Sequence, residues 1–262
     1  MNNNPELARF REHAHTVLAI ARFGGWELPA GYEQNAAIHQ AAADLARNAA
    51  PKITSDPTDP AKVAKWVNDA ARARVEHEHT ADVAAALADR AELEWIRCAL
   101  DAANSYARPL ADWFNERAER FAALAATAPH AIDVNTAPDE FEAHKELLKL
   151  AAALTVGSQY RAALAVATGE NETFGREPLW LVLDPAKTAS ISAIRAAVRA
   201  NLHPTDIDSW TNLTVLGCSM ASHGEAQRRR EQFMQLEHQH GIGRRDPDAA
   251  ISTAEEMARA VA

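Results

Sequence analysis

Apolar side chains recur every three or four residues along most of the chain, which is the spacing of helices that bury one face. A first helix is expected to begin at Pro5, since proline is favoured at the first helical position, and to end at a pair of glycines. A second helix is expected over residues 33–49. The two form a predicted N-terminal helical pair over residues 1–50, and the Pro-rich stretch 51–60 is interpreted as a linker.

The longest stretch without proline or glycine, residues 61–108, predicts one continuous helix about 70 Å long at about 1.5 Å per residue. Pro109 is expected to kink this helix, which then continues, so that the region spans residues 61–128. At about 100° per residue, tryptophans and alanines fall on one narrow stripe of its surface. The stripe, called the seam below, contains Trp66, Ala70, Ala73, His77, Ala84, Ala88, Ala91, Trp95, Ala102 and Trp113.

A third, C-terminal helical region is expected over residues 139–262. Its first helix should run to about residue 168, and shorter helices should follow, with a loop around Pro204 to Trp210. The short helices are expected at 190–202, 222–240 and 253–261. The apolar run 179–183 is the one strand-like segment, although its pattern fits a buried helix equally well. The pattern therefore predicts an all-α, elongated helical bundle with at most one short strand.

Composition supports long, thin helices over an aromatic-rich core. Aromatic residues make up only 6% of the chain, glycines number 10 and prolines 12, and much of the apolar content is alanine. The formal net charge is −9 and no segment is a basic arm, which disfavours nonspecific nucleic-acid binding. The chain starts without a signal-peptide pattern and has no apolar run long enough for a membrane span, so a cytoplasmic location is expected.

The two cysteines, Cys98 and Cys218, lie far apart in helix-like segments, which fits a reducing compartment. Arginine far outnumbers lysine and alanine is abundant, which suggests a GC-rich bacterial genome or a virus of such a host. No nucleophile or phosphate-loop signature is present, so we predict no catalytic residues and no cofactor.

A Glu-x-x-His pattern occurs three times on predicted helices, and its spacing puts a carboxylate and an imidazole on one helical face. Paired motifs of this kind build dinuclear metal sites in four-helix bundles. Three matches exceed only slightly what chance gives in a chain so rich in Glu and His. We therefore predict no metal and keep a dinuclear metal protein as an alternative, with candidate ligands Glu12, His15, Glu76, His79, Glu237 and His240.

Two arginine clusters flank the last long helix and form a second alternative, contact with nucleic acid. They contain Arg228, Arg229, Arg230, Arg244 and Arg245. Acidic residues interleave with them, and such mixtures are typical of a solvated or ion-paired face.

The seam supports the leading hypothesis, a non-enzymatic helical interaction or assembly protein. Alanines let helix backbones approach closely, and tryptophans supply the buried area that alanines lack. Such a protein fits a structural or accessory subunit of a bacterial or phage complex. The residues expected to bind a partner protein or a second copy are Trp66, Ala73, Ala84, Ala88, Trp95 and Trp113.

Overall fold

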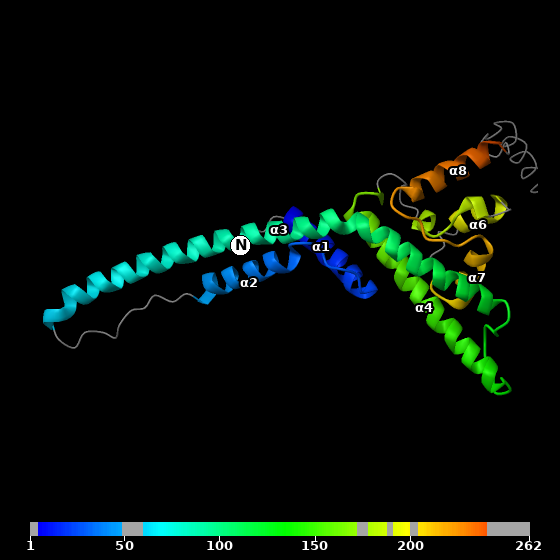
Figure 1. The fold of residues 1–262 in the computed structure, drawn as a ribbon, viewed down its shortest axis with the longest axis horizontal. Coiled ribbons are helices and arrows are strands. Elements are labelled where there is room, and N and C mark those ends of the chain that lie inside the picture. Colours follow the sequence, from blue (N-terminus) through cyan, green and yellow to red (C-terminus); the bar gives the residue numbers. More distant parts are fainter. Residues whose placement is uncertain (1–4, 49–59, 172–177, 188–190, 200–203, 240–262) are drawn as a thin grey trace, which may run out of the picture. The chain divides into compact units, whose positions relative to one another are not determined.

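The computed structural model describes residues 5–48, 60–171, 178–187, 191–199 and 204–239 (Figure 1). Within these ranges the chain forms seven α-helices and three short 3-10 helices, and the all-α prediction is confirmed. The α-helices are α1 (Pro5–Gly24), α2 (Tyr32–Asn48), α3 (Val63–Ala125), α4 (Pro138–Ala167), α6 (Ile191–Arg199), α7 (Ile207–Val215) and α8 (Glu225–Gln239). The 3-10 helices are η1 (Pro60–Lys62), η2 (Pro178–Leu181) and η3 (Pro185–Lys187).

Helix α3 is continuous over 63 residues and keeps Pro109 inside it. A proline within a helix removes one backbone donor and crowds the preceding turn, at a cost of about 3 kcal/mol. Tyr106, Ala107, Leu110 and Ala111 on both sides of the proline are buried, and their packing offsets that cost. The prediction of one very long helix is confirmed.

Burial along α3 repeats every eleven residues. Within one such series, Trp66 and His77 are half-buried, and the later members Ala88, Ala99, Leu110 and Phe121 are buried. Eleven residues make three turns at about 3.67 residues per turn, close to the natural period of an α-helix. One face of α3 therefore stays the inner face along its whole length.

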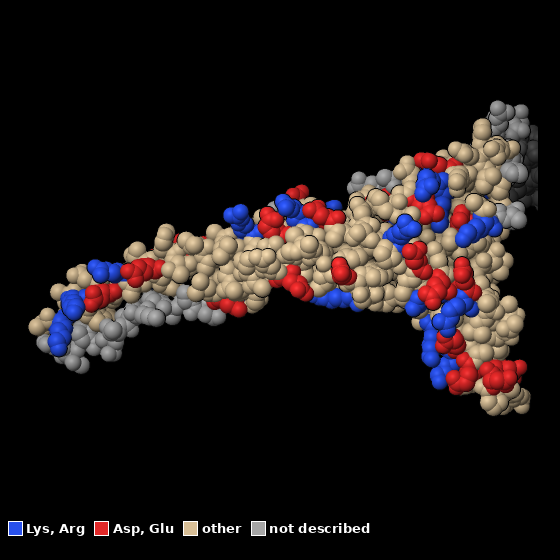
Figure 2. Space-filling model, viewed as in Figure 1, with Lys and Arg blue, Asp and Glu red and all other residues tan. Residues whose placement is uncertain are grey.

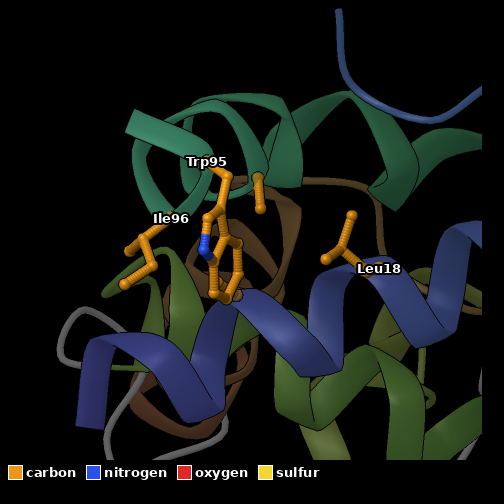
Figure 3. Close-up of a cluster of buried hydrophobic side chains, with 5 residues drawn as sticks. Leu18, Trp95 and Ile96 are labelled. Carbon is orange, nitrogen blue, oxygen red and sulfur yellow. The ribbon is translucent and has the colours of Figure 1, made fainter. Parts of the chain in front are cut away.

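The structure divides into two compact units, Met1–Ala103 and Asn104–Ala262, with the boundary inside α3. In the first unit, α1 packs on α3 through a small apolar cluster (Figure 3). Ala14 and Leu18 come from α1, and Trp95, Ile96 and Ala99 come from α3.

Helix α2 runs antiparallel along α3 in the same unit. Tyr32, at its start, lies edge-on to Trp95 with the ring centres 6.1 Å apart. About two turns later, His39 Nδ1 lies 3.0 Å from the backbone oxygen of Ala88. Because residue numbers rise along α2 as they fall along α3, the two helices point in opposite directions.

In the second unit, the last part of α3 and helix α4 pack closely at Gly157. A Cβ atom at that position would lie 2.8 Å from the ring of Trp113, so only glycine fits without a shift. Helix α7 completes this packing, because Trp210 Nε1 donates to Thr155 Oγ1 at 2.9 Å and its ring lies 5.8 Å from that of Phe114.

The expected loop over residues 204–210 is wrong from residue 207 onward, because α7 begins there. Asp206 caps the helix by accepting a hydrogen bond from the backbone N–H of Ser209 at 2.8 Å. Hydrogen bonds from Ser209, first from its backbone N–H and then from its hydroxyl, hold the pKa of Asp206 below its usual value. An aspartate followed three positions later by a serine is a capping signal. It was missed because the residues around Pro204 favour a turn.

The strand-like run 179–183 forms the 3-10 helix η2 and then one isolated antiparallel bridge between Leu183 and Cys218. The backbone N–H groups of Ser219 and Ala221 donate to the backbone oxygens of Val182 and Leu181, so the segment 179–183 pairs with the segment around residue 219. The predicted linker 51–60, apart from Pro60, and the predicted helix 253–261 lie outside the described residues. Among the described helices, none combines the length and apolarity of a membrane span.

Candidate functional site

The seam has two environments in the first unit. Its later part is core: Ala84, Ala88 and Ala91 are buried, and Trp95 is only 5% exposed. The ring of Trp95 lies 5.0 Å from that of His15 on α1, and Figure 3 shows the indole reaching from α3 toward α1. This part of the seam packs within the chain.

The earlier part of the seam extends beyond α2. The register set by Tyr32 with Trp95 and by His39 with Ala88 brings the end of α2 beside about residue 79 of α3. The segment from Val63 to Glu78, called the arm below, therefore runs on for about 24 Å past that point. Figure 1 shows α3 continuing well past the end of α2.

The arm carries an ordered set of side chains. Trp66, Ala70, Ala73 and His77 form its half-buried line, the continuation of the seam. Three valines on other sides of the helix are exposed: Val63 at 45%, Val67 at 49% and Val75 at 66%. Charged side chains of both signs occupy most of the remaining positions. Figure 2 shows such side chains near the start of α3.

The base of the arm is fixed by the core of the first unit. Besides the cluster around Trp95, Arg11 of α1 donates through Nε to Glu92 of α3 at 2.6 Å. That hydrogen bond raises the pKa of Arg11, against the opposing effect of its burial. These contacts fix α1 against residues 92–99 of α3, which follow the arm along the same helix.

Trp113 has a different setting from the arm tryptophan. It lies in the second unit, where the Arg117 guanidinium sits 4.1 Å from the ring centre and Gly157 approaches the ring. These two contacts are made within the chain, by α3 and α4.

The second unit contains a buried network of charged side chains that sequence analysis missed. Arg161 of α4 is fully buried and donates through Nη2 to Glu170 at 2.6 Å. It also donates through Nε to the backbone oxygen of Ala221 at 2.8 Å. Glu170 in turn accepts from the backbone N–H of Gly224 at 2.7 Å. The pair holds both ends of the segment 221–224.

Arg229 of α8 repeats this arrangement on the same segment. It is 3% exposed, donates to the backbone oxygen of Ser219 at 2.6 Å and pairs with Glu225 at 2.9 Å. Glu225 accepts from the backbone N–H of Ser222 at 2.8 Å. Burial works to raise the pKa of Glu225, but hydrogen bonds from Ser222 and Arg229 outweigh it and the pKa is lowered.

The buried network of charged side chains holds the backbone of residues 219–224 in place. Burial lowers the pKa of Arg161, with Glu170 opposing the shift, and burial of the Cys218 thiol raises its pKa to about 12. Such a thiol is not a nucleophile at neutral pH. Arg161 Nη1 and Arg229 Nε have no hydrogen-bond partner within the described part of the chain. Most of the other hydrogen bonds of the two guanidinium groups hold the segment 219–225, and this is a structural role.

The candidate metal ligands are not brought together. His15 packs on Trp95, whereas Glu76 lies in the arm, about 28 Å earlier along the same helix. Glu237 forms an ion pair with Arg195 at 2.6 Å. The remaining candidates Glu12 and His79 lie on α1 and in α3 just past the arm, and His240 lies outside the described residues. No group of three or more ligand-type side chains within metal-binding reach occurs among the described residues.

The three arginines of the cluster on α8 differ in how far they are buried. Arg228 is exposed and Arg230 half-buried, but Arg229 is committed to the buried network. Arg244 and Arg245 lie outside the described residues. Figure 2 shows basic and acidic side chains interspersed over the second unit, without a continuous basic surface on this face.

Comparison of the chain with protein-family models, with curated proteins and with solved structures found no match.

Proposed function

We propose that this chain is an interaction or assembly protein that binds another protein chain along the arm. It would act without chemistry of its own, as a subunit of a cytoplasmic complex in a bacterium or its virus. The observation that carries the proposal is that the seam continues along α3 for about 24 Å past the end of α2.

The small side chains along the arm are of the kind on which helices pack. Ala70 and Ala73 lie on its half-buried line, and alanines let a second helix approach closely.

The core of the first unit gives the arm a rigid base. Trp95 and the ion pair between Arg11 and Glu92 fix α3 against α1 about 20 to 25 Å along the helix from the end of the arm. A binding helix that is already ordered avoids part of the entropy cost of association. Binding through the arm would then extend an existing helix interface instead of ordering a loose segment.

A pair of matched double variants tests the proposal. Ala70→Arg with Ala73→Arg places two long charged side chains on the seam. Ala64→Arg with Ala71→Arg adds the same charge on nearly the opposite face of the arm, at two exposed alanines. Arginine is nearly as good a helix former as alanine, so both variants should keep their helical circular dichroism.

The readout is the composition and mass of complexes that the full-length chain forms, by cross-linking and native mass measurement in host extract and with purified protein. We expect the seam variant to lose the assembled species and the control variant to retain it. Equal retention by the two variants, with helicity unchanged, would contradict binding through the arm.

A further inference from the structure

We draw no further inference here: the strongest candidate, the line of exposed apolar side chains Phe141, Leu148 and Val166 along one face of α4, carries nothing because nothing in the described part of the chain shows what covers it.

Discussion

Trp95→Ala is the most direct test of the core that supports the arm. The indole is 5% exposed and contacts α1 near His15 and the start of α2 at Tyr32. A tryptophan buries about 200 Å², which at about 25 cal/mol per Å² amounts to about 5 kcal/mol of transfer free energy. Alanine retains a small part of that and the cavity collapses in part, so we expect a loss of about 3 to 5 kcal/mol.

Trp66→Ala is the matched control, because it makes the same change on the same helix at a half-buried position outside the cluster. Its cost to the monomer should be about 1 kcal/mol. Urea unfolding of the full chain, followed by circular dichroism, gives the stabilities, and two units call for a two-transition fit. Hydrogen exchange should show lost protection in α1 and α2 for Trp95→Ala only. Equal stability losses for the two variants would refute the division of the seam into core and arm.

Three further predictions concern the second unit. Arg161→Met should cost about 3 to 5 kcal/mol because it removes the buried guanidinium that pairs with the Glu170 carboxylate at 2.6 Å, and adding Glu170→Met should recover part of that loss in denaturant unfolding. Cys218, with its pKa raised to about 12, should resist thiol reagents at pH 8 until the chain is unfolded; because its folded pKa lies above the unfolded value, its contribution to stability is fully present below about pH 9 and is lost as pH rises toward 12. Gly157→Ala should lower the melting temperature despite the better helix propensity of alanine, since its methyl group would meet the Trp113 ring at 2.8 Å; a higher melting temperature would show that the ring yields easily.

The long helices could be predicted because their signal is local. Absence of proline and glycine over residues 61–108 and a constant inner face are properties of the chain itself, and the helix they predict is α3. The end of α4 could be predicted in the same way, because Gly169 adopts a φ of 72°, which glycine tolerates best. Helix α7 escaped because its nine residues carry too few turns for a period to show against the nearby loop signals.

The buried network could not be predicted because it joins residues far apart in the chain. Arg161 reaches Ala221 and Ser222 across about sixty positions, and nothing near Arg161 distinguishes it from a surface arginine on an amphipathic helix. Arg229 was assigned to a basic cluster on the same ground. Burial of a charge depends on partners supplied by other elements, and periodicity carries no information about them.

The seam shows the same limit of periodicity, which cannot reveal what other elements contribute to the surroundings of a residue. Trp66 and Trp95 occupy equivalent places on one face of α3, and periodicity assigns them one role. The structure gives them different surroundings, because α2 ends at Asn48 and so covers α3 only to about residue 79. How much of the seam serves the interface with α2 is therefore set by how far α2 runs along α3, and this is a property of another element that the spacing along α3 does not reveal.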